Sequence, residues 1–328
     1  MAADPLQQLG AAARNDRALV VRGLTDAASM REVIWPTFRA DVAPWAELDY
    51  AQDVIAPRLL RAIADAEPAD RPTVALVSNP APFDRAGLVE PYRTPYEERF
   101  PAGWLDPDGR WLPIYVQPIV AIHNVHRIPP PTAWQQLGDP ALRGRVALDD
   151  PARMLTSGPA LAELSSRLDA AAWTGLVSAI GANGPLLVAD NERSVLEVST
   201  GARWLGLSNW NVARRVRAGS PVRHVFLQPT PCIPGFGVLV AGAPASALGR
   251  LFLAWLSSER GQRAYAATGR IPARPDVDAQ PSLAGVLPAG IEALFGSTDW
   301  LAEPERWAAR YRELIPADRG SAAEGKLR

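Results

Sequence analysis

The sequence has little cysteine and little lysine, and each scarcity excludes a class of protein. The single Cys232 excludes an intramolecular disulfide and any metal site built from several cysteines. Lys326 is the one lysine among 34 Lys and Arg residues, which balance 35 Asp and Glu residues to a net charge of −1. Because charges of both signs are spread along the chain, no basic surface for nucleic acid is predicted.

Long apolar runs are also absent. No stretch of about 18 uncharged apolar residues occurs, so the sequence predicts no membrane-spanning helix. The first residues, Met1-Ala-Ala-Asp-Pro5, have neither the basic part nor the apolar part of a secretion signal. Two interpretations stay open: a cytosolic protein, or a secreted one whose signal has been removed before Met1.

Histidine is scarce too, and none of the three stands in a G-x-S-x-G, C-x-x-C or H-E-x-x-H context. His123 and His126 are three positions apart on a predicted strand, where they face opposite sides, so two ordinary histidines are expected rather than a metal pair. Cys232 has no evident activating partner and is expected to be a packed thiol. The sequence therefore predicts neither a metal nor a cofactor.

What is present is enough for two domains. The chain has 328 residues, of which 48% are hydrophobic and 21% charged, close to the average of globular proteins. Strand and helix patterns alternate, which favours an α/β protein with parallel strands. The tail from Gly320 to Arg328 has the composition of an unstructured end.

The first third begins with a strand over 18–21 and a helix whose apolar face carries Met30, Val33 and Ile34. Thr25 or Asp26 is the expected N-cap of this helix, and Pro36 is expected to kink or end it. A helix over 57–66 and a strand over 74–77 follow. The turn Asp106-Pro-Asp-Gly109 predicts a hairpin between aromatic stretches at 100–105 and 111–116.

The rest of the chain continues the alternation. Strands are predicted over 120–125, 145–148, 185–189, 203–207 and 235–240. Helices are predicted over 159–168, 170–180, around 248–255, 258–267 with Ser257 as its cap, and 300–314.

Two spaced motifs resemble the type II periplasmic solute-binding proteins of ABC importers, in the branch that includes the ferric-iron-binding proteins. The first is Trp134-x-x-Leu137-x-x-Pro140-x-x-x-Gly144-x-Val146, followed by Pro151. Trp134 and Leu137 share a helix face, Pro140 stops that helix, and Gly144 frees the turn into the next strand.

The second motif lies in the last third of the chain. It comprises Ala243-Pro244, Phe252-Leu-Ala-Trp-Leu-Ser257, Gly261-Gln262 and Ile271-Pro-Ala-Arg-Pro275. Between the two motifs, Asp106-Pro-Asp-Gly-Arg-Trp111 and Tyr115-Val-Gln-Pro118 resemble the family's approach to its first interlobe crossover. Together the matches follow the family's order over roughly residues 18–275.

The resemblance implies a two-lobed α/β fold with a ligand cleft between the lobes and hinge closure on binding. Crossovers are expected near residues 114–120 and 220–229. Lobe one would be discontinuous, comprising 1–116 and 224–290, lobe two would comprise 117–223, and 291–328 is not assigned to either lobe. The resemblance also implies an extracytoplasmic protein, with the signal removed, that delivers its ligand to an ABC permease.

In such folds the ligand is held by loops at the carboxyl ends of strands and by helix N-termini. The expected ligand-binding residues are Thr25, Asp26, Ser78, Asn79, Tyr115, Gln117, Arg153, Thr156, Ser157, Gly158, Asn191, Arg193, Asn209, Trp210 and Asn211.

Residues 156–159 are the most informative of these segments. Pro159 suits the first turn of a helix, Ser157 is a good cap, and Gly158 would let an anion approach free backbone N–H groups. Arg153 and Arg193 could clamp the same anion. The alternative is that Thr156 or Ser157 only caps its own helix and that both arginines are solvated.

The other candidates have structural alternatives as well. Thr25 and Ser78 could only cap a helix and form a turn, and Tyr115 and Trp210 could be packing residues. The iron-binding relatives carry a Tyr-Tyr-x-x-Arg pattern, and the matching stretch here is Trp210-Asn211-Val-Ala-Arg214. Indole and amide groups do not supply the anionic oxygens that a hard trivalent cation prefers, so this position does not favour iron.

The leading hypothesis is a monomeric, non-enzymatic protein that captures a small anionic or zwitterionic organic solute, such as a carboxylate, phosphonate or organophosphate, for ABC import. The alternatives are a ferric-iron protein with a synergistic anion, an enzyme on the same scaffold, and a sensor domain. Among the partners, a small-molecule ligand and a permease are expected, and nucleic acid is not.

Overall fold

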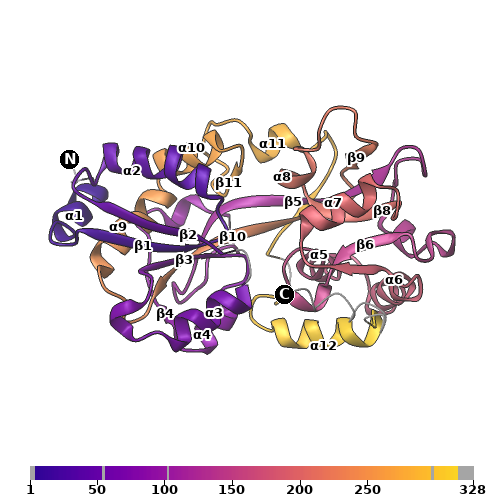
Figure 1. Cartoon of the computed structure of the whole chain (residues 1–328), viewed down its shortest axis with the longest axis horizontal. Coiled ribbons are helices and arrows are strands. Elements are labelled where there is room, and N and C mark those ends of the chain that lie inside the picture. The colour runs from indigo at the N-terminus through magenta and orange to yellow at the C-terminus, as the bar shows by residue number, and fades with distance from the viewer. Residues whose placement is uncertain (1–3, 54–55, 102, 297–298, 317–328) are drawn as a thin grey trace. The chain divides into compact units, whose positions relative to one another are not determined.

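The computed structural model describes residues 4–53, 56–101, 103–296 and 299–316 (Figure 1). The predicted tail at 320–328, with Lys326, lies outside these residues. The chain divides into two compact units: unit 1 (Met1–Val116 and Pro234–Val286) and unit 2 (Gln117–Ile233 and Leu287–Arg328). No described helix has both the length and the apolar character needed to cross a membrane.

Two long strands pass from one unit to the other, and they are β5 (Leu112–Asn124) and β10 (Thr230–Val240). The first crossover between the units falls between Val116 and Gln117, and the second between Ile233 and Pro234. The sequence analysis predicted the second crossover near residues 220–229, which is earlier in the chain. The start of β10 belongs with unit 2 because Thr230 and Pro231 pair with β12 (Ala293–Leu294).

Unit 1 is built on a sheet with the strand order β2-β1-β3-β10. Strand β1 is parallel to β2 and β3, whereas β10 is antiparallel to β3. The strands that complete the unit are β1 (Ala18–Gly23), β2 (Glu47–Gln52), β3 (Val74–Val77), β4 (Val89–Glu90) and β11 (Ile271–Pro272). Every residue of β3 is buried, as expected of a strand covered on both faces.

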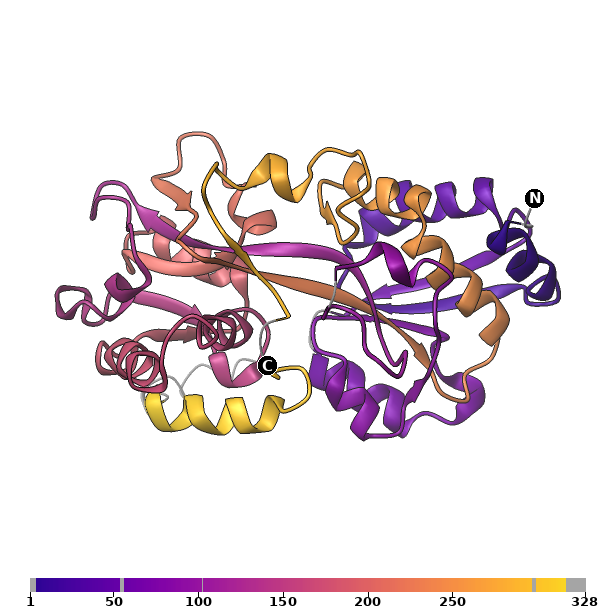
Figure 2. The ribbon, with the colours of Figure 1, turned by 180° about the vertical axis from the view of Figure 1, so that it is seen from behind.

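Helices cover both faces of this sheet, with α2 and α10 on one side and α3 and α4 on the other (Figures 1 and 2). The helices of unit 1 are α1 (Pro5–Ala12), α2 (Trp35–Asp41), α3 (Ala56–Asp65), α4 (Ala81–Arg85), α9 (Ser246–Ser257), α10 (Glu259–Ala267) and α11 (Leu283–Val286). The ring of Phe38 packs edge to face on Phe252, at 5.0 Å, and on Trp255, at 5.4 Å.

Unit 2 has the strand order β5-β8-β6-β7, in which β8 and β7 both run parallel to β6. Its own strands are β6 (Val146–Asp149), β7 (Leu186–Val188), β8 (Leu205–Asn209), β9 (Val222–Val225) and β12. Its helices are α5 (Ser157–Leu164), α6 (Ala170–Ala182), α7 (Asn191–Ser199), α8 (Trp210–Ala213) and α12 (Pro304–Leu314). The C-terminal helix α12 packs on α5 and α6, which places it in unit 2.

The predicted alternation of strands and helices is confirmed, but individual elements differ, and helices α1 and α7 and strand β9 were not predicted. No strand forms at the described residues of 100–105, so the turn at 106–109 closes no hairpin. Strand β2 was also missed, because Glu47, Asp49 and Gln52 make it largely polar. Helix α5 starts and ends earlier than the predicted 159–168. Ser258, not Ser257, accepts the capping hydrogen bond of α10 from Gly261 N, at 3.2 Å.

Pro36 is a further difference. It does not end the helix, because the chain continues without a break from a π-helical stretch, Ser29–Ile34, into α2. Trp35 N still donates to the Met30 carbonyl in the π-helical pattern. The change to α-helical hydrogen bonding therefore falls beside Pro36, which has no N–H to donate.

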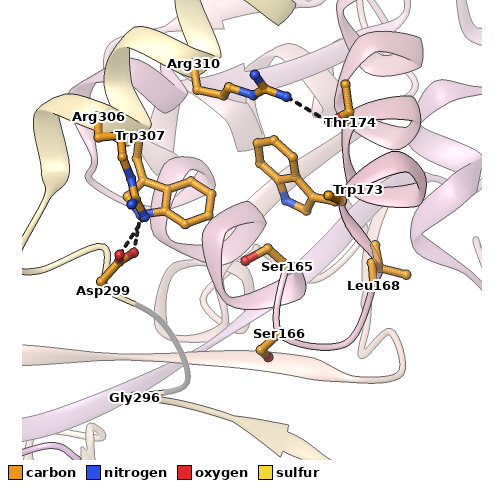
Figure 3. A pocket seen from close by; sticks show the side chains of 11 residues that line it. Ser165, Ser166, Leu168, Trp173, Thr174, Gly296, Asp299, Arg306, Trp307 and Arg310 are labelled. Atoms are coloured by element: carbon orange, nitrogen blue, oxygen red, sulfur yellow. Dashed lines mark hydrogen bonds and ion pairs between the residues drawn. The ribbon is translucent and has the colours of Figure 1, made fainter.

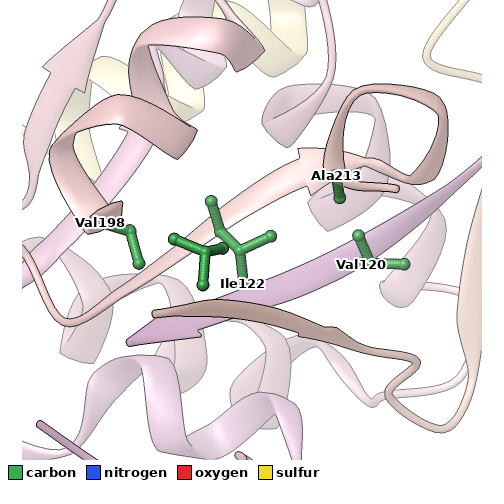
Figure 4. Packing of buried hydrophobic residues seen from close by; sticks show 5 residues of the cluster. Val120, Ile122, Val198 and Ala213 are labelled. Atoms are coloured by element: carbon green, nitrogen blue, oxygen red, sulfur yellow. The ribbon is translucent and has the colours of Figure 1, made fainter. Parts of the chain in front are cut away.

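A compact apolar cluster joins the sheet of unit 2 to its helices (Figure 4). Val120 and Ile122 on β5 meet Val198 on α7, Ala213 on α8 and Val222 on β9, and all five are buried.

We expect Ile122→Ala to lower the free energy of unfolding by about 2–5 kcal/mol, because removing part of a fully buried side chain would leave a cavity. Val125→Ala, at an exposed position just after β5, should change it by less than about 0.5 kcal/mol. Urea unfolding of both variants checks this, and equal effects would contradict the assignment of the cluster as core.

Candidate functional site

Unit 1 carries a polar cluster just beyond the carboxyl end of β1, and it contains Thr25, Asp26, Ser29, Tyr115, Tyr265 and Arg270 (the Arg270 cluster). The side chain of Arg270 is only 7% exposed, and its Nη2 donates to Asp26 Oδ2 at 2.9 Å. Its guanidinium carbon lies 5.6 Å from the centroid of the Tyr115 ring. A buried cation is thus held by one carboxylate and one aromatic ring.

Asp26 combines capping with ion pairing. Its Oδ1 accepts a hydrogen bond from Ser29 N at 2.8 Å, and its Oδ2 accepts one from Ser29 Oγ at 2.9 Å. Burial alone would raise the pKa of Asp26, but the hydrogen bonds from Ser29 and Arg270 outweigh burial and lower the pKa to about 2. Of the two predicted capping residues, Asp26 makes the hydrogen bond to the helix.

Two tyrosines of unit 1, Tyr50 and Tyr265, have hydroxyl groups that are hydrogen-bonded within the protein. Tyr265 stacks on Tyr115 at 5.6 Å, and its hydroxyl lies 3.1 Å from the fully buried Thr25 Oγ1. The Tyr50 hydroxyl donates to the carbonyl oxygens of Gly23 and Thr25. Burial raises the pKa of Tyr50 and of Tyr265, so both stay protonated at neutral pH.

At the end of β3, Ser78 is half-buried and Asn79 is buried. The Asn79 Oδ1 accepts a hydrogen bond from Ala81 N at 3.2 Å, so its side chain holds the start of α4.

Unit 2 places its predicted residues at the carboxyl ends of the parallel strands β6, β7 and β8. The carboxylate of Asp149, the last residue of β6, accepts hydrogen bonds from Thr156 N at 3.1 Å and from Ser157 N at 2.9 Å. It also accepts one from Ser157 Oγ at 2.5 Å. Asp149 is buried, and that burial raises its pKa even though these hydrogen bonds oppose the rise.

This geometry corrects the expectation for the first turn of α5. The N–H groups of Thr156 and Ser157 already bind the chain's own carboxylate, so an external anion would have to displace Asp149. Gly158 is required by packing, since a Cβ there would lie 2.2 Å from the carbonyl oxygen of Pro151. The Gly158 carbonyl accepts a hydrogen bond from the Tyr311 hydroxyl at 2.6 Å.

The two predicted arginines also have partners within the chain. Arg153 donates to the Ala189 carbonyl at 3.0 Å, and Arg193 pairs with Glu197 on the next turn of α7 at 2.7 Å. The Arg193 side chain is 51% exposed, which agrees with the alternative of a solvated surface arginine.

A chain of amides links the other strand ends. The Asn191 Nδ2 donates to Thr156 Oγ1 at 3.0 Å, and its Oδ1 accepts from Asn209 N at 3.1 Å. The Asn209 Oδ1 caps α8 through Val212 N at 2.9 Å. Hydrogen bonds therefore connect the N-termini of α5, α7 and α8. This agrees with the prediction that these residues lie together at the carboxyl ends of strands.

Helix α8 presents a stacked pair next to this network. The Arg214 guanidinium lies 4.9 Å from the centroid of the Trp210 ring, and its Nε donates to Asn211 Oδ1 at 3.2 Å. Gln117, also predicted, is half-buried on β5, the strand that pairs with β8.

The described residues hold no group of three or more His, Cys, Asp or Glu side chains that could bind a metal ion. His123 is buried and its Nδ1 lies 3.3 Å from the Ile128 carbonyl oxygen, whereas His126 is exposed. Burial raises the pKa of the Cys232 thiol, which is the packed thiol that the sequence predicted.

A family model described as "Bacterial extracellular solute-binding protein" matches residues 40–286, most of the chain. The chain belongs to this family. The predicted resemblance is thereby confirmed, and the protein is a bacterial extracellular solute-binding protein. No curated protein matches the chain.

Solved structures agree with this solute-binding fold. The iron-bound HitA from Pseudomonas aeruginosa is similar with a TM-score of 0.73 and 16% identity, over 91% of this chain and 99% of that one. The ferric binding protein from Campylobacter jejuni gives 0.74 and 14%, over 90% and 99%. AfuA from Actinobacillus pleuropneumoniae, with exogenous fructose-6-phosphate bound, gives 0.74 and 16%, over 92% and 99%. These likenesses confirm the predicted two-lobe mixed α/β fold of periplasmic binding proteins.

Five residues of these clusters in this solute-binding protein were not among the predicted ligand-binding residues: Ser29, Asp149, Arg214, Tyr265 and Arg270. Arg270 is separated from Asp26 by 244 positions, and no local pattern signals that contact. Asp149 could have been found, because an acidic residue at the end of a buried strand and before a Thr-Ser helix start is a candidate capping group.

The pair of Asp26 and Arg270 predicts a pH dependence of stability. The folded-state pKa of Asp26 is about 2 and its ordinary value is 3.8, so the stabilisation is complete above about pH 4 and is lost as the pH falls towards 2. We expect Asp26→Asn to lower the free energy of unfolding by about 1–2 kcal/mol at pH 7, a value reduced because the Asp26 side chain is 34% exposed.

Asp49→Asn is the matched control, because Asp49 pairs with Arg22 while its side chain is 60% exposed, and it should cost less than about 1 kcal/mol. Urea unfolding between pH 7 and pH 3 measures both variants. A deficit of Asp26→Asn that does not shrink as the pH falls would contradict the assigned ion pair.

Proposed function

We propose that this protein captures a small organic anion or zwitterion outside the cytoplasm and delivers it to the permease of an ABC importer. Carboxylates, phosphonates and organophosphates are the classes expected. The proposal is of a monomer that binds without catalysis, with no nucleic acid partner.

The arrangement at α8 carries this proposal. Trp210, Asn211 and Arg214 supply an aromatic face, an amide and a guanidinium at the carboxyl end of β8. Such groups recognise a planar or charged organic group by stacking and by charge-assisted hydrogen bonds. We assign the anionic group of the solute to this position instead of to Ser157, whose N–H and hydroxyl bind Asp149.

Unit 1 supports a solute with charges of either sign. Arg270 and Asp26 place a cation and a carboxylate side by side at the end of β1, and Asp26 keeps a third of its side chain exposed. An exposed carboxylate with a pKa of about 2 is ionised at neutral pH and can accept a hydrogen bond from an ammonium or hydroxyl group. This feature favours zwitterions and hydroxylated acids.

Ferric iron is the second candidate, because two of the similar structures are described as iron-bound or ferric-binding. Iron in a phenolate site requires tyrosine oxygens that can reach the metal, whereas the hydroxyl groups of Tyr50, Tyr265 and Tyr311 are hydrogen-bonded within the protein. The position that matches the tyrosine pair of the iron-binding relatives holds Trp210 and Asn211, which supply no anionic oxygen. AfuA is described with a sugar phosphate, which falls within the organic class.

We therefore expect the purified protein to stay colourless when ferric salts are added with carbonate or phosphate. Visible absorption spectroscopy measures this directly. A phenolate-to-iron band that disappears when any one tyrosine is replaced by phenylalanine would overturn the organic-solute proposal in favour of iron.

A thermal-shift screen over phosphonates, sugar phosphates, carboxylates and amino acids should identify the solute, because a ligand at a hundred times its Kd adds about 2.7 kcal/mol of stability. For the best compound, we expect Arg214→Gln to weaken binding about tenfold or more, since a charge-assisted hydrogen bond is lost.

Arg215→Gln is the matched control, with the same change of charge at the neighbouring exposed position. It should leave the affinity within about twofold. Calorimetric titration measures the affinity of both variants. Equal affinities would show that the solute does not bind at α8.

A further inference from the structure

Unit 2 contains a groove away from the strand ends, between the segment that joins α5 to α6 and the C-terminal helix α12 (Figure 3). Its volume is about 950 Å³, at the upper end of the range of small-molecule sites. Residues on both sides line it, and those used in the argument are Trp173, Thr174, Arg306, Trp307 and Arg310.

Two indole rings form the apolar part of the groove. Trp173 and Trp307 pack edge to face, with centroids 5.4 Å apart and planes at 78°. The Trp173 Nε1 donates to the Leu161 carbonyl at 2.7 Å, and the Trp307 Nε1 donates to Asp299 Oδ1 at 2.9 Å. Both indole N–H groups are satisfied within the protein, so the rings contribute aromatic surface to the groove, most of it from Trp307 because Trp173 is only 5% exposed.

The two arginines at the groove differ in their partners. Arg306 pairs with Asp299 at 2.5 Å and with Glu303 at 2.9 Å. Arg310 donates to Thr174 Oγ1 at 2.9 Å and lies 6.0 Å from the Trp173 ring centroid. Within the ranges that the structure covers, Arg310 forms no ion pair with a carboxylate. A positioned cation beside aromatic surface therefore lacks an anionic partner.

We propose that this groove is a second ligand site, which binds a small aromatic carboxylate with its ring against the two indoles and its carboxylate at Arg310. The aromatic rings favour a planar apolar body, and Arg310 favours one negative charge next to it. Thr174 fixes the guanidinium in place, so less side-chain freedom is lost on binding. The site is independent of the solute site proposed at α8.

Phenylacetate is the probe, and ligand-observed NMR with calorimetry measures its binding to the full chain. Two matched compounds separate the contributions: 2-phenylethanol keeps the ring without the charge, and cyclohexylacetate keeps the charge without the aromatic ring. We expect phenylacetate to bind more tightly than either. Arg310→Gln should weaken phenylacetate about fivefold to tenfold, a loss reduced by solvent because Arg310 is exposed.

Arg312→Gln is the control variant, because it makes the same change of charge on the same helix at an exposed position that does not line the groove. It should bind phenylacetate as the unaltered protein does. Circular dichroism checks that both variants fold, so a loss of binding can be assigned to the site.

Four outcomes would overturn the proposal. Phenylacetate that does not bind at millimolar concentration means that the groove takes no aromatic acid. Equal binding of 2-phenylethanol, or an unchanged affinity in Arg310→Gln, would show that Arg310 does not bind the carboxylate. Binding that is lost in Trp210→Leu but kept in Arg310→Gln assigns the probe to α8 instead, which would support the proposed function and exclude the second site.

Discussion

The buried carboxylate of Asp149 is the constraint on which the strand ends of unit 2 depend. It takes two backbone N–H groups and one hydroxyl from the first turn of α5, and those donors would otherwise face an external anion. A buried carboxylate without such partners would be costly, so the helix start and the carboxylate stabilise each other. Consequently the N–H groups of Thr156 and Ser157 at this helix start are already bound to an internal carboxylate.

In unit 1 the buried group is a cation, because the Arg270 side chain is only 7% exposed, and its positive charge requires a partner of opposite charge. Its ion pair with Asp26 and its position over Tyr115 compensate this charge, and Tyr265 and Thr25 hold the ring stack in place. Asp26 also caps the helix after β1, because it accepts a hydrogen bond from Ser29 N. One carboxylate thus couples the local geometry of the chain near residue 26 to the segment near residue 270, so the cluster at the end of β1 forms only when the whole unit has folded.

Much of this architecture could be predicted from the sequence, and the reason differs between elements. Strand β3 and helix α10 are signalled by local patterns of apolar residues, and the positive φ of 65° at Gly144 is signalled by the residue type. The partners of Ser157 and Asp26 could not be predicted, because hydrogen bonds to Asp149 and Arg270 depend on tertiary contacts. Ser157 suits either an external anion or an internal carboxylate, and only the fold decides between them.

The same distinction explains why the family is recognisable although the solute is not. The residues of the second motif hold the scaffold: buried Gln262 donates to the carbonyls of Ile114 and Leu256, each at 2.8 Å, and accepts from Arg274 N at 3.1 Å. Gly261 leaves no room for a side chain, since a Cβ there would lie 2.0 Å from the Trp255 carbonyl oxygen. These positions tolerate little change whatever the solute is. Trp210 packs against the apolar cluster of unit 2 and Asn211 accepts a hydrogen bond from Arg214, and these local contacts do not by themselves name a solute.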